Sequence, residues 1–196
     1  MTNKNYLEDL NNSKKTFIIY KSNKGFDLYT DFSKKIILTN NNVKRFINES
    51  TKLKSKRKET DLFIGFFGYE ILNNLIGVKV KKQKGLKFPK GIFYKPETKL
   101  KLPIKLNYRN LGIVKPNTLF KININKTSYK IIFNKFKKKI KSGETYQIKI
   151  CTKYRNKTQI DALDFFCRLV KSNMAPEAFM IKDKDYSIIS CSPENL

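Results

Sequence analysis

The stretch 129–154 constrains the fold more than any other part of the sequence. Apolar residues recur there at three- and four-residue spacing over three turns, which predicts an amphipathic helix; they are Tyr129, Ile132, Phe133, Phe136 and Ile140. Thr127 or Ser128 can cap the start of this helix, and Gly143 stands where helices commonly stop. From Tyr146 onward apolar and polar residues alternate, which predicts a strand directly after the helix.

The rest of the chain is expected to be rich in short strands. Apolar and alternating runs predict strands at 16–20, 26–30, 36–39, 91–94, 99–104 and 119–124, and a hairpin that joins 178–181 to 186–191. Helices are predicted around 45–47, at 68–76 and at 161–171. Short strands with few linking helices predict an α+β fold with antiparallel sheets and helices outside them. We divide the sequence into a β-rich region, 1–125, and a second region, 126–196.

The chain is strongly basic and has no histidine. Among its 196 residues, 42 are Lys or Arg and 16 are Asp or Glu, which gives a net charge of +26. Such a charge is typical of polyanion binding, but nearly all of the excess is Lys, which an AT-rich genome also favours. Proteins that bind nucleic acids usually contact phosphates and bases through Arg, which is scarce in this chain. Nucleic-acid binding is therefore the second alternative and is not expected. The lack of His excludes Ser-His-Asp and Cys-His catalysis and leaves acid–base chemistry to Glu, Asp, Lys, Tyr or Cys.

Nothing in the sequence predicts a membrane segment. The N-terminal residues are polar, without the apolar core of a signal peptide. The longest nearly apolar run, Leu62–Tyr69, is far shorter than a bilayer span. We therefore expect a cytoplasmic protein without a membrane partner.

Four short motifs carry a family resemblance, and they occur in the family's order along nearly the whole chain. They are residues 65–70 (GFFGYE), 142–148 (SGETYQI), 173–176 (NMAP) and 188–194 (IISCSPE). Each is similar to an element of the chorismate-utilising enzymes, in particular component I of aminodeoxychorismate synthase and of anthranilate synthase. The chain is therefore identified as resembling this family.

The resemblance implies a fold and an activity. The family has a large α+β domain of antiparallel sheets with helices outside. These two enzymes aminate chorismate with Mg²⁺ and take ammonia from a glutamine amidotransferase subunit. The aminodeoxychorismate branch (para-aminobenzoate and folate biosynthesis) is our main expectation, because the part before Gly143 is short for an anthranilate synthase. Anthranilate synthase component I (tryptophan biosynthesis) is the alternative.

The resemblance also assigns site residues. Glu194 matches the Glu of the S-P-E corner, which the family places beside the C4 hydroxyl that leaves chorismate, so we expect Glu194 to be the catalytic acid. Ser22, Tyr146 and Pro176 match positions that line an amino-acid pocket in the family, whereas Glu177 stands where an aromatic residue is usual. The family's catalytic Lys and its Mg²⁺-binding glutamates follow the S-P-E corner. We therefore expect no metal ligands in this chain, a fold that is incomplete at the C-terminus, and no activity from the chain alone.

Overall fold

The structure is a computed structural model that describes residues 3–51, 58–78, 88–103, 106, 108, 120–157 and 160–191. The chain divides into two compact units. Unit 1 is drawn from Met1–Arg109 and Ala162–Leu196, and unit 2 from Asn110–Asp161. Residues 162–191 belong with the N-terminal part because their hairpin pairs with the first strand of the chain. The predicted division of the sequence at residue 125 stays a prediction.

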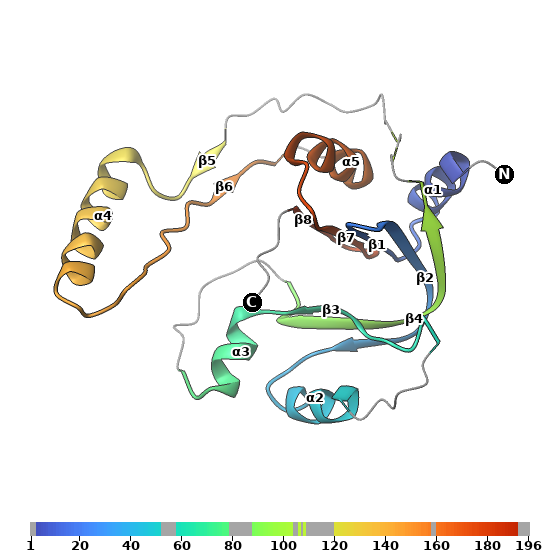
Figure 1. Cartoon of the computed structure of the whole chain (residues 1–196), viewed down its shortest axis with the longest axis horizontal. Coiled ribbons are helices and arrows are strands. Elements are labelled where there is room, and N and C mark those ends of the chain that lie inside the picture. The colour runs from blue at the N-terminus through green and yellow to red at the C-terminus, as the bar shows by residue number, and fades with distance from the viewer. Residues whose placement is uncertain are drawn as a thin grey trace. The chain divides into compact units, whose positions relative to one another are not determined.

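Unit 1 is built on a six-stranded antiparallel sheet with the strand order β3-β4-β2-β1-β7-β8 (Figure 1). The strands are β1 (Phe17–Ser22), β2 (Gly25–Ile37), β3 (Ile64–Phe67), β4 (Gly91–Leu102), β7 (Ala178–Lys182) and β8 (Ser187–Cys191). The helices are α1 (Asn3–Asn12), α2 (Val43–Thr51), α3 (Tyr69–Leu75) and α5 (Ala162–Asn173). This arrangement confirms the predicted α+β class with antiparallel strands and outer helices.

The main core lies where α1 and α5 cover one face of the sheet. Alternate residues of β1, β2 and β7 point to this face because side chains along a strand alternate between its two sides. The buried residues are Leu7, Leu10, Phe17, Ile19, Phe26, Leu28, Leu102, Leu163, Phe166, Cys167, Ala178 and Met180. The apolar face of α5 therefore packs against the apolar face of the central strands. The helix predicted at 161–171 and the hairpin predicted at 178–191 are both present.

The other face of the sheet is enclosed because β2 and β4 are long and the sheet curls (Figure 1). The register of β2 against β4 shifts between Phe32 and Lys34, and a bulge of this kind bends a strand. Ile18, Tyr29, Ile92, Tyr94 and Ile181 form a second core inside the curl. The prediction of a separate third strand at 36–39 is wrong, since β2 continues past the bulge, and the strands expected at 91–94 and 99–104 are one strand, β4.

A third core joins α2 and α3 to the first residues of β4. Its buried members are Leu38, Val43, Phe46, Ile71 and Phe93. The two glycines of the 65–70 motif lie beside it and allow a close approach of β3 to β4. A Cβ atom on Gly65 would lie 1.9 Å from the carbonyl oxygen of Ile92, and one on Gly68 would lie 2.1 Å from that of Lys90. The motif's spacing therefore has a packing reason in this chain.

Unit 2 contains one long helix, α4 (Lys126–Lys141), and a short pair of strands, β5 (Lys121–Ile122) and β6 (Tyr154–Arg155). The predicted helix is confirmed, but its cap is Asn125, whose side-chain oxygen accepts a hydrogen bond from the Ser128 amide at 2.8 Å. Gly143 follows the helix with a positive φ of 76°.

The strand expected from Tyr146 onward is largely wrong. Of that stretch, only Tyr154 and Arg155 pair with another strand, and residues 145–153 have no regular structure. Ile148 and Ile150 instead line an apolar groove beside Phe133, Phe136 and Ile140 of α4. The alternation thus reflects contact with a helix, since a strand also needs a partner for its backbone groups.

None of the helices among the described residues is long and apolar enough to cross a bilayer.

Candidate functional site

The structure brings two of the predicted site residues to one corner of unit 1. Ser22 ends β1, and Pro176 lies just before β7, which pairs with β1 so that Lys21 is opposite Ala178. The Lys21 ammonium fixes the corner by donating hydrogen bonds to the carbonyl oxygens of Ala175 and Pro176, the latter at 3.1 Å. The Ser22 hydroxyl accepts a hydrogen bond from the Lys24 amide at 3.2 Å. Ser22 and Pro176 are therefore neighbours across the start of the β1–β7 pair.

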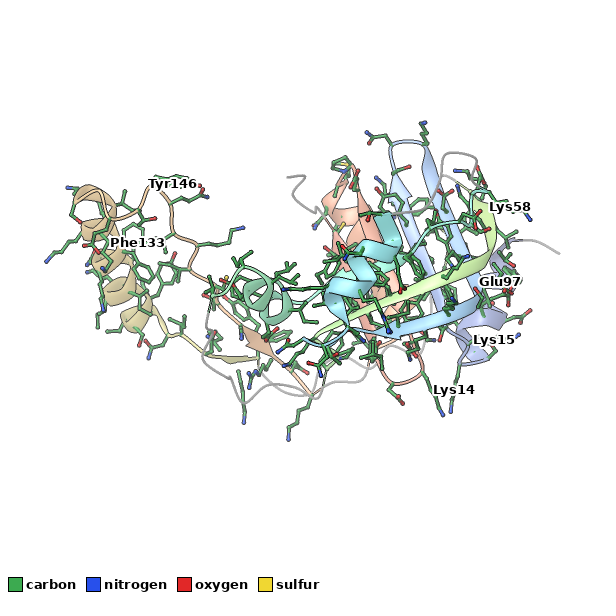
Figure 2. All side chains as sticks on the ribbon, turned by 90° about the horizontal axis from the view of Figure 1, so that it is seen from below. Lys14, Lys15, Lys58, Glu97, Phe133 and Tyr146 are labelled. Carbon is green, nitrogen blue, oxygen red and sulfur yellow. The ribbon has the colours of Figure 1, made fainter. Side chains whose placement is uncertain are left out.

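The structure does not test the position of the other two predicted residues relative to this corner. Tyr146 lies in unit 2 and is 92% exposed; Figure 2 labels it together with Phe133 of the same unit. Its membership of an amino-acid pocket with Ser22 and Pro176 stays a prediction. Glu194 lies outside the described residues, so its predicted role as the acid is also untested.

Glu177 extends the corner with a carboxylate. Glu177 lies near the hydroxyl of Tyr20, and burial, followed by the Glu177 charge, raises the pKa of Tyr20. Tyr20 therefore stays protonated and remains a hydrogen-bond donor across the neutral range. Where the family usually has an aromatic residue, this chain has a carboxylate beside the Tyr20 hydroxyl.

A row of paired charges continues along the same face of the sheet. Asp27 lies directly opposite Tyr20 across β1 and β2, so the two side chains share a face. Lys101 Nζ lies 2.5 Å from Oδ1 of Asp27, and Lys99 Nζ lies 3.5 Å from Oδ2. Lys99 also lies over the ring of Tyr29, and burial and then the Asp27 carboxylate raise the pKa of that tyrosine. We call Tyr20, Asp27, Tyr29, Lys99 and Lys101 the polar strip.

The polar strip can orient a ligand but is poorly suited to transfer protons. Its Asp27 carboxylate is paired with two ammonium groups, and both of its tyrosines are held in the neutral form. Among the residues that the structure describes, no three His, Cys, Asp or Glu side chains come close enough to hold a metal ion. The polar strip thus presents paired charges and neutral hydroxyl groups on this face of the sheet.

A second polar cluster lies at the opposite end of β1, and no local sequence pattern indicates it. Asp183 follows β7 and is buried; its carboxylate accepts a hydrogen bond from the hydroxyl of Tyr94 and another from the Lys184 amide at 2.6 Å. Lys35 Nζ of β2 lies 2.7 Å from the same carboxylate. Burial alone raises the pKa of Asp183, but the hydrogen bonds from Lys35, Tyr94 and the Lys184 amide together hold it below its ordinary value. Residues 182–185 (KDKD) look like a solvated turn, so only the tertiary structure identifies Asp183 as buried.

In unit 2, the GETYQI motif begins with a partnered carboxylate. Lys139 of α4 donates a hydrogen bond to Glu144, and this hydrogen bond lowers the pKa of the Glu144 carboxyl. Ser142 donates a second hydrogen bond to Glu144 at 3.2 Å. Glu144 thus closes the C-terminal end of α4, where the family usually has Asp.

Residues 111–196 match the family model described as chorismate binding enzyme. This part of the chain is similar to the chorismate-utilising enzymes. The matched residues contain the GETYQI motif, the loop at Pro176 and the hairpin of β7 and β8 that leads to the S-P-E corner. The predicted resemblance to this family is thereby confirmed for the part of the chain that carries these three motifs.

Three curated proteins that are similar to part of this chain have the same name. Anthranilate synthase component 1 of Buchnera aphidicola subsp. Diuraphis noxia is 25% identical over 186 residues, which cover 77% of this chain and 36% of that protein. The protein of the same name from Buchnera aphidicola subsp. Schizaphis graminum (strain Sg) is 29% identical over 126 residues, covering 64% of this chain and 23% of its own length. That from Thermococcus kodakarensis is 33% identical over 60 residues, covering 31% and 14%. The chain spans about a third or less of the length of the curated relatives it matches.

Proposed function

We propose that this chain is part of component I of a synthase that aminates chorismate. The match of residues 111–196 to the chorismate-binding family carries this proposal. The similarity to proteins named anthranilate synthase component 1 supports the amination of chorismate in particular. In this proposal the chain acts in the cytoplasm, and a glutamine amidotransferase subunit supplies the ammonia.

The branch of the family is the finer part of the proposal. The names of the relatives favour anthranilate synthase, which makes it the first candidate here. Aminodeoxychorismate synthase component I, the main expectation from the sequence, is the second candidate, and the carboxylate of Glu177 favours it. A carboxylate in the corner of Ser22 and Pro176 would oppose the binding of an indole ring, because burying a charge against an apolar ring costs free energy.

Glu194 is the proposed acid for the loss of the C4 hydroxyl. Hydroxide is a poor leaving group, so an acid must protonate it as the bond breaks. The chain has no His to share this task. The family's Mg²⁺ would help to bind chorismate, but the described residues form no site for it. We therefore expect its ligands to come from the part of the relatives that this chain does not span.

The test supplies that part as a second polypeptide. The chain is mixed with the C-terminal part of one of the Buchnera relatives, chorismate, Mg²⁺ and ammonium, and the loss of chorismate is followed. We expect consumption of chorismate by the mixture and none by either polypeptide alone. Mass spectrometry of the product then distinguishes anthranilate from aminodeoxychorismate. An associated mixture that consumes no chorismate would contradict the proposed function, and turnover by this chain alone would contradict its dependence on the second polypeptide.

The role of Glu194 is tested in the active mixture. Glu194→Gln keeps the shape of the side chain but cannot deliver a proton, and general acid catalysis is typically worth about 10²–10⁴ in rate. We expect kcat to fall by about that factor with little change in KM. Glu97→Gln is the matched control, because Glu97 is an exposed residue of β4 that Figure 2 labels on unit 1. Equal kcat values for the two variants would remove Glu194 from the mechanism.

A further inference from the structure

Unit 1 has a pocket of about 310 Å³ beside the first residues of β1. Its lining residues are Lys15, Thr16, Asp31, Phe32, Lys35 and Tyr94. Thr16 precedes β1 and Ser22 ends it, so the pocket lies at the opposite end of this strand from the Ser22–Pro176 corner. Neither the proposed function nor the polar strip uses these residues.

Two aromatic rings give the pocket an apolar wall. The rings of Phe32 and Tyr94 have centroids 5.2 Å apart and are tilted by 55°. Phe32 lies where the register of β2 shifts, and the preceding Asp31 has a left-handed backbone with φ of 51°. Bulges of this kind turn side chains in new directions and are frequent beside binding sites. The wall is also firmly held, because Tyr94 is buried and hydrogen-bonded to Asp183.

The charges around the pocket are only partly paired. The Lys35 ammonium is held by the buried Asp183 carboxylate. By contrast, Lys15 and Asp31 form no ion pair with any described residue, although both line this pocket. The hydrogen bond that Asp31 accepts comes from the neutral hydroxyl of Thr30 at 3.0 Å. Figure 2 shows Lys15 at the edge of unit 1. One ammonium and one carboxylate thus line the same pocket without neutralising each other.

We propose that this pocket binds a small α-amino acid with an apolar side chain. Its carboxylate would pair with Lys15, its ammonium with Asp31, and its side chain would contact the rings of Phe32 and Tyr94. A simple anion would be attracted by Lys15 but repelled by Asp31. A simple cation would be attracted by Asp31 but repelled by Lys15. A zwitterion satisfies both charges at once, and pockets of this size are typical of small-ligand sites.

Three probes that share one apolar group test the charge requirement. The full chain is titrated calorimetrically with leucine, with 4-methylpentanoate, which lacks the ammonium, and with 3-methylbutylamine, which lacks the carboxylate. We expect leucine to bind at least about tenfold more tightly than either analogue, since each analogue leaves one charge of the pocket without a partner. Equal binding of leucine and either analogue, or no binding of leucine at millimolar concentration, would overturn the proposal.

Variants locate the binding in this pocket. Lys15→Met and Asp31→Asn should each weaken leucine binding at least about tenfold, and both residues are exposed, so the fold should tolerate the changes. Asn is chosen at Asp31 because it also accepts a left-handed backbone. Lys34→Met is the matched control: Lys34 is an exposed neighbour of Lys35 in β2 that does not line the pocket. Glu177→Gln, in the distant corner, should also leave leucine binding unchanged. If Lys34→Met or Glu177→Gln weakens binding as much as Lys15→Met does, the site is not this pocket.

Discussion

The ammonium group of Lys35 lies 2.7 Å from the carboxylate of Asp183. Lys35 belongs to β2 beyond the bulge, and Asp183 begins the turn between β7 and β8, so their ion pair joins the two parts of the curled sheet. The Asp183 side chain is 3% exposed and that of Lys35 is 45% exposed. A buried carboxylate is tolerated only when it is well paired and hydrogen-bonded. Tyr94 and the Lys184 amide provide the further donors.

Replacing Asp183 with Asn should destabilise unit 1. The amide keeps the shape of the side chain but removes the charge that Lys35, Tyr94 and the Lys184 amide share, and hydrogen bonds to charged groups contribute about 1.5–3 kcal/mol. We expect the free energy of unfolding in urea to fall by about that amount. Asp185→Asn, at an exposed position of the same turn, should change it by less than about 0.5 kcal/mol. Similar losses in the two variants would contradict the importance of the buried ion pair.

The same cluster should make the free energy of unfolding depend on pH under both acidic and basic conditions. The folded pKa of Asp183 lies below its ordinary value of 3.8, so its contribution to stability is fully present above pH 3.8 and is lost as the pH falls through the folded pKa. Burial and the hydrogen bond to Asp183 raise the pKa of Tyr94 above its ordinary 10.0, so stability also falls as the pH rises above 10.0. Urea unfolding across pH checks both signs. The difference between the native protein and Asp183→Asn should shrink below pH 3.8, and a constant difference would contradict the assignment.

Neighbouring phenylalanines of α5 should respond very differently to truncation. Phe166 is fully buried and meets the ring of Phe26 edge-on, with centroids 6.5 Å apart, whereas Phe165 is 42% exposed. Phe166→Ala removes a buried ring and leaves a cavity, which typically costs about 3–5 kcal/mol. Phe165→Ala should cost less than about 1 kcal/mol. Chemical denaturation of the two variants measures this contrast, and equal costs would place the wrong face of α5 against the sheet.

Gly65→Ala should loosen the edge of the sheet. The added Cβ would lie 1.9 Å from the carbonyl oxygen of Ile92, so β3 must move away from β4. Such overpacking typically costs about 1–3 kcal/mol. Hydrogen exchange should become faster at the amides that join β3 to β4, while the β1–β7 pair serves as an internal reference. Unchanged exchange at β3 would show that the close approach is not required.

Features that depend on local sequence were predictable. The helical periods of α4 and α5 and the β7–β8 hairpin follow from patterns a few residues long, and the structure has all three. The alternation from Tyr146 misled because apolar residues at every second position also suit a segment that lies along a helix, as Ile148 and Ile150 do beside α4. Pattern alone cannot say whether a partner strand exists.

The predicted site residues came from motifs, and their roles stay predictions. The resemblance pointed to Ser22 and Pro176, and the β1–β7 pairing makes them neighbours. No local pattern could pair Tyr20 with Glu177 or Lys35 with Asp183, because each pair is distant in the sequence and meets through the strand order. Asp183 and Asp185 look equivalent in the sequence, yet one is buried and the other exposed.

The central place of β1 has a consequence for how the chain folds. One edge of β1 pairs with its sequence neighbour β2, and the other pairs with β7, near the opposite end of the chain. During synthesis, β1 therefore presents an unpaired row of backbone groups until residues 178–182 have emerged from the ribosome, and such an open edge can recruit other chains. Closing this long loop slows folding, since contacts between distant residues form late. The β7–β8 hairpin therefore pairs with β1 late, and we expect a chain that stops before it to aggregate.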